Sequence, residues 1–120
     1  MPNWVDFKAT IIGSDTIYQK LLKKYKEDPR VALDIGNKGL YNPDIQKYNE
    51  SIILLGEVKW GYTYKNFKDF VKYIMDTESN KENIHIKIHC KDAPNNINDV
   101  YEFVNHTYIH KYTQEIIEIE

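Results

Sequence analysis

The 120-residue chain has a single cysteine, which excludes an internal disulfide and fits a reducing compartment such as the cytosol. No apolar run approaches the ~18 residues that a membrane-spanning helix needs, and no basic segment followed by an apolar one stands at the start. A large charge of one sign is also lacking, because 16 basic and 18 acidic residues give a net charge of −2. This balance argues against a protein that binds mainly through phosphate contacts. We therefore expect a cytoplasmic protein that makes no membrane contact.

Motifs for catalysis and phosphate binding are missing as well. The sequence has no Walker A loop, no Gly-x-Gly-x-x-Gly fingerprint, no Gly-x-Ser-x-Gly elbow and no His-Glu-x-x-His helix. Cys90 alternates with isoleucines, which is typical of a small core residue, and the adjacent His89 falls on the other face of the same segment. We expect a protein that is not an enzyme, with no catalytic residue and no cofactor.

The four histidines form two pairs, His85 with His89 and His106 with His110. On a strand, residues four apart lie roughly 13 Å from each other, too far for one metal ion with ~2.0 Å bonds to nitrogen. A helix would bring such a pair together, but residues 107–109 are poor helix formers. A cross-strand site with one histidine from each pair is the alternative, although no second cysteine or carboxylate pattern supports it. The spacing favours surface histidines and no metal site.

Apolar residues are abundant, with 16 isoleucines, 10 tyrosines, 4 phenylalanines and 2 tryptophans, and we expect one domain over residues 1–120. Two segments show the i, i+3, i+4, i+7 apolar spacing of amphipathic helices. The first follows Ser14, a good N-cap, and must stop before Pro29. The second has Asn66 as its candidate cap and should end at Ser79 and the asparagine after it.

Three segments alternate apolar and polar side chains, which predicts half-buried strands at 4–11, 51–60 and 84–90. In the second of these, the alternation places Trp60 on the apolar face. Gly56 in the same segment indicates a β-bulge or a close approach of another backbone.

Two stretches are ambiguous. Residues 31–35 fit a short strand and 44–49 one helical turn, with turn residues between them, so this part is either a strand or a loop. From Tyr101 onward the chain alternates loosely. The turn-like pair at 105–106 would divide it into a hairpin, and a helix at 99–104 is the alternative.

Charge is unevenly distributed along the chain. Residues 1–30 hold 6 basic and 4 acidic side chains, and this excess is typical of a solvated helix face. Residues 91–120 hold 2 basic and 6 acidic side chains. The last seven residues, Gln-Glu-Ile-Ile-Glu-Ile-Glu, are typical of an exposed strand edge protected by charge.

The order of these elements predicts an α+β fold of the ferredoxin-like split β-α-β type, with two helices packed on one face of an antiparallel sheet and an extra C-terminal strand or hairpin. Such a sheet leaves its other face uncovered, and RNA-recognition modules stack bases on that face. Six aromatic or basic residues are expected there: Trp4, Lys8, Lys59, His85, Lys87 and His89.

Four tyrosines lie in or beside loops, Tyr41, Tyr48, Tyr62 and Tyr64, and tyrosine supplies rigid amphipathic contact area. Of these, Tyr62 and Tyr64 complete this candidate interaction surface. Ordinary positions at the edge of the core are the alternative for many of the ten tyrosines. The aromatic and basic residues also suit RNA or single-stranded DNA, but the RNA-recognition signature is absent. Elimination favours a protein partner over nucleic acid, and the sequence indicates no oligomeric state.

The opening Met-Pro-Asn-Trp of residues 1–4, followed by an alternating strand that ends in Ile-Gly at 12–13, resembles the YubB-like ferredoxin-fold proteins of phages and plasmids. Trp-Gly at 60–61, ahead of the second helix, is similar to a strand end in that family. The chain departs from the family pattern at Val5 and in a shorter middle region. The family has no established activity, so the resemblance implies a fold and a mobile-element origin but no functional residue.

These observations together predict a small binding protein, encoded by a phage or another mobile element, that acts on a host protein in the host cytosol. An anti-defence or anti-CRISPR inhibitor is one specific form of that function. The alternative is binding of RNA or single-stranded DNA through the open face of the sheet.

Overall fold

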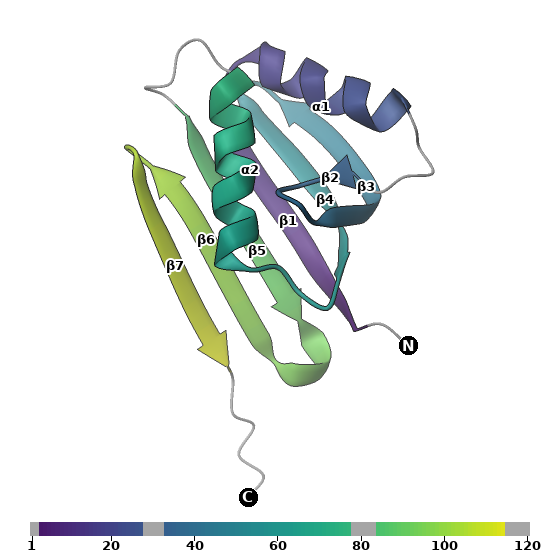
Figure 1. Ribbon diagram of the computed structural model, residues 1–120, viewed down its shortest axis with the longest axis vertical. Helices are drawn as coiled ribbons and strands as arrows, with labels where there is room; N and C mark the ends of the chain where they lie inside the picture. Colours follow the sequence, from purple (N-terminus) through teal and green to yellow (C-terminus); the bar gives the residue numbers. More distant parts are fainter. Residues whose placement is uncertain (1–2, 28–32, 78–83, 115–120) are drawn as a thin grey trace, which may run out of the picture.

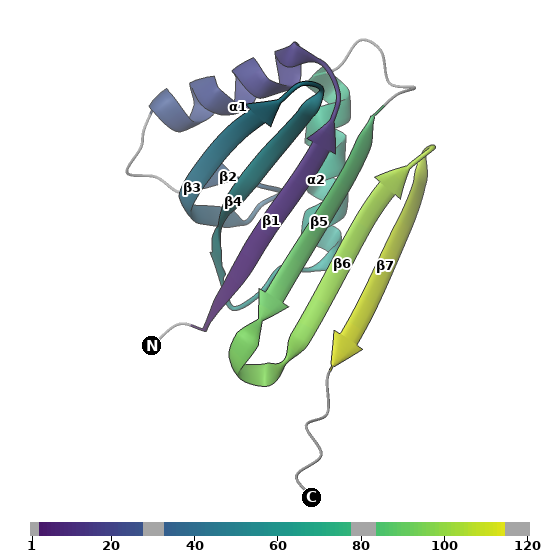
Figure 2. The ribbon, with the colours of Figure 1, turned by 180° about the vertical axis from the view of Figure 1, so that it is seen from behind.

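The computed structural model describes residues 3–27, 33–77 and 84–114. In this part of the chain, two helices lie on one face of a seven-stranded antiparallel sheet with the order β2-β3-β4-β1-β5-β6-β7 (Figure 1 and Figure 2). The elements, with a 3-10 turn at Ala93–Asn95 between the fifth and sixth strands, are β1 (Trp4–Ile12), α1 (Asp15–Glu27), β2 (Leu33–Asp34), β3 (Gly39–Tyr48), β4 (Ser51–Lys59), α2 (Tyr64–Thr77), β5 (His85–Asp92), β6 (Ile97–Val104) and β7 (Thr107–Gln114). Neither described helix is long and apolar enough to cross a bilayer.

The core lies between the sheet and the two helices. The central strands bury alternate side chains on this side, as the sequence predicts: in β1 these are Val5, Phe7, Ala9 and Ile11. Strands β4 and β5 extend the same layer on either side of β1. The apolar stripe of α2 closes it from above, with Phe67, Phe70, Val71 and Ile74 all buried. Burial of this apolar layer, at about 25 cal/mol per Å² removed from water, is the main force that joins helices to sheet.

The α+β class and the packing of two helices on one sheet face are confirmed, but the strand order is not that of a ferredoxin-like split β-α-β sheet. Three strands cause the difference: β2 lies outside β3 at one edge, and β6 and β7 extend the other. The last two form a hairpin through the turn at 105–106, as predicted. The alternative helix at 99–104 is wrong, because β6 buries Tyr101 and Phe103 with the two-residue period of a strand.

The helical turn predicted at 44–49 is also wrong, since β3 continues as a strand to Tyr48. Its register against β4 shifts between Tyr41 and Asp44, so that Pro43 falls in a bulge where its missing N–H costs no ladder bond. The bulge stands opposite Gly56. A Cβ there would lie 2.8 Å from the backbone carbonyl oxygen of Tyr41, which confirms the predicted close approach of another backbone.

Trp60 does not lie on the apolar face, contrary to the prediction. Strand β4 ends at Lys59, and Trp60 has a φ of +66°, which turns its side chain out of the strand alternation. Its indole is 70% exposed. The Trp60 N–H donates to the carbonyl of Asn3 at 2.7 Å, so the end of β4 is joined to the start of β1.

The N-cap of α2 is Thr63, and the prediction of Asn66 as the cap is wrong, because Asn66 is the third residue of the helix. The Thr63 hydroxyl oxygen accepts a hydrogen bond from the Asn66 N–H at 3.1 Å, and the Asn66 side-chain oxygen accepts one from the Thr63 N–H at 3.0 Å. This reciprocal pair is a capping box with asparagine in the usual place of Glu or Gln. The predicted helix end at Ser79 and the acidic stretch 115–120 lie outside the described residues.

Candidate binding face

The face of the sheet that carries no helix, called here the open face, is seen in Figure 2. The strand register and the burial pattern place on it all six of the residues predicted for it. Trp4, Lys8, Lys87 and His89 are exposed, whereas Lys59 and His85 are half-buried. The register brings them together in part: Trp4 stands opposite Lys59, and Lys8 opposite His89. Strands β6 and β7 widen the sheet sideways and do not cover this face.

Trp4, Tyr41 and Lys59 form a compact group at one end of the open face, the Trp4 cluster. The Trp4 and Tyr41 rings meet edge to face with centroids 5.3 Å apart. The Lys59 ammonium lies 4.7 Å from the Tyr41 ring centroid and 5.6 Å from that of Trp4. Cation–π contacts of this kind contribute about 0.5–1 kcal/mol at exposed sites. The cluster is therefore an ordered amphipathic patch, in which Trp4 is 39% exposed.

A shallow hollow lies in the middle of the open face. Its lining includes Gly56 together with Asp6, Lys8, Leu55 and His89. His89 Nε2 lies 2.9 Å from the side-chain oxygen of Asn98 on β6. The hollow mixes apolar, acidic and basic groups, so it suits a partner surface of equally mixed character.

The histidines are distributed over both faces of the sheet. His85 lies 3.3 Å from a Glu102 oxygen on the open face, whereas His110 lies 2.8 Å from Asp99 on the helix side and stacks on Tyr101 at 4.4 Å. The alternative of one site built from both pairs is therefore wrong, because His85 and His89 lie on the open face, whereas His110 lies on the helix side and His106 lines a groove beside α2. Within the described residues, no three His, Cys, Asp or Glu side chains converge on a point where a metal could bind.

We expect dialysis against EDTA to leave the melting temperature unchanged, since His85, His89 and His110 each pair with a single polar neighbour on another strand rather than with one another. Differential scanning fluorimetry before and after dialysis measures this, with elemental analysis of the untreated protein alongside. One equivalent of a metal, together with a drop of several degrees on its removal, would contradict the prediction.

Tyr62 and Tyr64 do not lie on the open face. Tyr62 is 5% exposed, and its hydroxyl donates to the Ile35 carbonyl at 2.7 Å, so it is a core residue and not a surface contact. Burial raises the pKa of its hydroxyl far above the ordinary value. Tyr62 is buried because it directly follows the turn at Gly61, between β4 and α2, where the φ of Gly61 is +106°. Tyr64 is half-buried at the start of α2, stacked at 6.2 Å on Tyr101.

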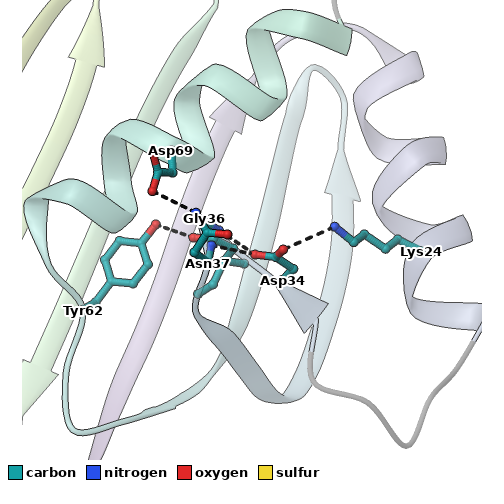
Figure 3. Close-up of polar contacts among 7 residues, drawn as sticks. Lys24, Asp34, Gly36, Asn37, Tyr62 and Asp69 are labelled. Atoms are coloured by element: carbon teal, nitrogen blue, oxygen red, sulfur yellow. Dashed lines mark hydrogen bonds and ion pairs between the residues drawn. The ribbon is translucent and has the colours of Figure 1, made fainter.

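The turn after β2 is tied to both helices by the polar contacts in Figure 3. The Asp34 carboxylate accepts hydrogen bonds from the N–H groups of Gly36 and Asn37, at 3.0 and 2.8 Å, and forms an ion pair with Lys24 on α1. The Asn37 side chain donates to Asp69 on α2 at 3.0 Å. These groups satisfy one another, so they hold the turn in place and form no site for a ligand.

Cys90 is buried at 3% exposure, as its alternation with isoleucines predicts. Burial, followed by the nearby charge of Asp99, raises the pKa of its thiol well above the ordinary value. Burial therefore disfavours the thiolate form that a nucleophilic cysteine needs.

Sequence reasoning named Tyr41 as a tyrosine in or beside a loop but missed its contact with Trp4, because Tyr41 falls in the ambiguous stretch. It also missed a polar row on β3, where Gln46 donates to Asp44 at 2.7 Å and accepts from the Tyr48 hydroxyl at 2.8 Å. A signal for this row was present, since polar side chains recur at every second position around Ile45.

No family model matches the chain, and neither curated proteins nor solved structures gave a match. The resemblance to YubB-like proteins rests on the quoted residues alone.

Proposed function

We propose that this chain is a non-enzymatic protein that binds a host protein through its open face, with the Trp4 cluster at the centre of the contact. The cluster is the observation that carries the proposal. Tryptophan and tyrosine dominate binding hot spots, because a large ring with few rotatable bonds loses little entropy on contact. Trp4 and Tyr41 already hold each other in place before any partner arrives.

The charge around the cluster favours a protein over a nucleic acid as the partner. Basic and acidic side chains are interspersed on the open face, with Lys91 opposite Asp6 and Lys87 opposite Glu102 in the strand register. A phosphate backbone needs a positive stripe, whereas a protein surface of mixed charge is matched by a mixed one. Binding of RNA or single-stranded DNA is the second candidate, supported by three lysines on the open face, Lys8, Lys59 and Lys87, of which Lys59 lies beside the exposed Trp4 ring.

The resemblance of residues 1–4 to phage and plasmid proteins supports a more specific form of the proposal: a mobile-element protein that inhibits a host defence protein. The same resemblance supports an elaborated ferredoxin-like unit. The inner strand order β3-β4-β1-β5, with α1 after β1 and α2 after β4, fits such a unit, with β2, β6 and β7 added at its edges.

We expect Trp4→Ala to abolish recovery of the partner from a host lysate while the protein stays folded, because it removes the exposed ring of the cluster. Immobilised wild type and variants are compared by quantitative mass spectrometry. Trp60→Ala is the matched control: Trp60 is the more exposed indole at 70% against 39%, but it borders a hollow on the helix side with Tyr62 and Tyr112.

Equal loss in both variants would contradict a contact centred on Trp4. The nucleic-acid candidate is tested with labelled single-stranded DNA and RNA at ~0.15 M salt, where charges more than ~8 Å apart are largely screened. Micromolar binding at this salt that is lost in Lys87→Glu would overturn the protein-binding proposal in favour of the second candidate.

A further inference from the structure

The two edges of the sheet differ in how their backbones are protected. On one side, β3 carries Pro43 and a bulge, and the two-residue β2 lies beside it, all of which obstruct pairing with another strand. On the other side, β7 pairs with β6 in an unbroken register from Thr107 to Gln114. This strand has eight residues, neither proline nor bulge, and no strand on its outer side among the described residues. It presents a regular row of backbone donors and acceptors.

The side chains of β7 fit a second copy of the same strand. Tyr108 and Tyr112 lie on the helix side at 38% and 57% exposure, with His110 between them. If two copies pair antiparallel with His110 opposite His110, each Tyr108 stands opposite a Tyr112, and cross-strand aromatic pairs of this kind stabilise sheets. The same register places Lys111 opposite Ile109. A register centred on Lys111 would instead place two like charges opposite each other.

A basic groove lies between α2 and the β6–β7 hairpin. Lys65, Lys68 and Lys72 line its helix wall, and Phe103, His106 and Tyr108 line its hairpin wall. The spacing of the lysines puts them on one face of the helix. Asp69 is the one acidic residue in the lining, and its carboxylate accepts a hydrogen bond from the Asn37 side chain. The groove thus offers positive charge beside aromatic surface.

The residues that follow β7 have the complementary composition: 115–120 read Glu-Ile-Ile-Glu-Ile-Glu. Within one copy, the eight residues of β7, about 26 Å at the usual strand rise, separate Gln114 from the hairpin turn beside the groove. Figure 1 shows this turn and the end of β7 at opposite ends of the hairpin. Antiparallel pairing with a second copy removes that separation, because the end of one β7 then lies beside the start of the other.

We propose that β7 is a self-association strand: two copies pair antiparallel about a two-fold axis at His110, and residues 115–120 of each copy bind the groove of Lys65, Lys68 and Lys72 in the other. The contact is the same for both copies, so it closes on itself and stops at a dimer. The two sheets join into one, and both open faces lie on the same side of it.

Sedimentation equilibrium over a hundredfold range of protein concentration tests the proposal. Tyr112→Lys should raise the dimer dissociation constant at least about tenfold, because it removes both Tyr108–Tyr112 pairs and brings charge onto the edge. Tyr48→Lys is the matched control: this tyrosine lies on β3 with nearly the same exposure, 58% against 57%, and its substitution should leave the dimer intact. A monomer at every concentration, or a dimer unaffected by Tyr112→Lys, would overturn the proposal.

A charge exchange tests the groove without altering β7. The double variant Lys68→Glu/Lys72→Glu should weaken the dimer, and so should the double variant Glu118→Lys/Glu120→Lys. The fourfold variant that combines them should restore the dimer. These lysines are exposed, so this arm remains decisive even if Tyr112→Lys impairs folding. Reversal of Lys8 and Lys87 on the open face is the control and should have no effect. Failure of the fourfold variant to recover the dimer, or assemblies that grow beyond it, would refute the arrangement.

Discussion

Replacing Ile86 with alanine should lower the free energy of unfolding by about 2–5 kcal/mol. Ile86 is fully buried in the middle of β5, between Ile11 of β1 and Phe103 of β6. Truncation removes buried methyl groups and leaves a cavity. The neighbouring strands β1 and β6 cannot move in to fill it, because they are hydrogen-bonded to β5. Chemical denaturation with guanidinium measures the loss.

His85→Ala is the control for this prediction, one residue away on the open face. His85 is half-buried beside Glu102, and its removal should cost under about 1 kcal/mol, as for most surface contacts. If both variants lose the same stability, β5 is covered on both sides in solution. That result would also argue against the open face as a free binding surface.

The elements that the sequence predicted well are those whose burial is decided by local periodicity. In β1 and β5 every second residue is apolar, as at Phe7 and Ile88, and both strands have neighbours on either side, so the pattern and the burial coincide. The stripe of α2 is equally regular. For such segments the hydrophobic effect acts in the same direction as the local conformational preference.

The errors arise where a residue far along the chain decides the conformation. The alternation at residues 44–49 is short, and Pro43 interrupts it on the N-terminal side. Pairing with β4, with the bulge opposite Gly56, is what makes this segment a strand. Tyr62 follows a loop glycine and therefore resembles a surface tyrosine. Its burial depends on an acceptor 27 residues away, the Ile35 carbonyl, which no local pattern encodes.

The candidate site was predictable to the same extent as the strands that carry it. Trp4, Lys8 and Lys87 occupy the polar positions of regular strands, so their common face follows from alternation alone. The contact between Trp4 and Tyr41 depends instead on the register of β3 against β4, which shifts at the bulge. Pairing registers between distant segments are the information that a single sequence carries least clearly.

The same kind of distant contact makes Gly36 the second position where a small change should have a large effect. Gly36→Ala should lower the free energy of unfolding by about 2–5 kcal/mol, from backbone strain and overpacking together. Gly36 has a φ of +102°, which disfavours any side chain. An added Cβ would overlap the Asn66 carbonyl and lie 2.9 Å from the Phe70 nitrogen, both in the backbone of α2.

Gly61→Ala separates the two causes, because Gly61 has nearly the same φ, +106°, but nothing within 4 Å of an added Cβ. Gly61→Ala should therefore lower the free energy of unfolding only by the backbone strain, about 1–2 kcal/mol. The difference between the two variants in urea or guanidinium denaturation then measures the cost of separating the turn after β2 from α2. That separation would also break the 2.8 Å hydrogen bond from the Asn66 side chain to the Gly36 carbonyl. Equal losses in the two variants would mean that the turn does not pack against α2 in solution.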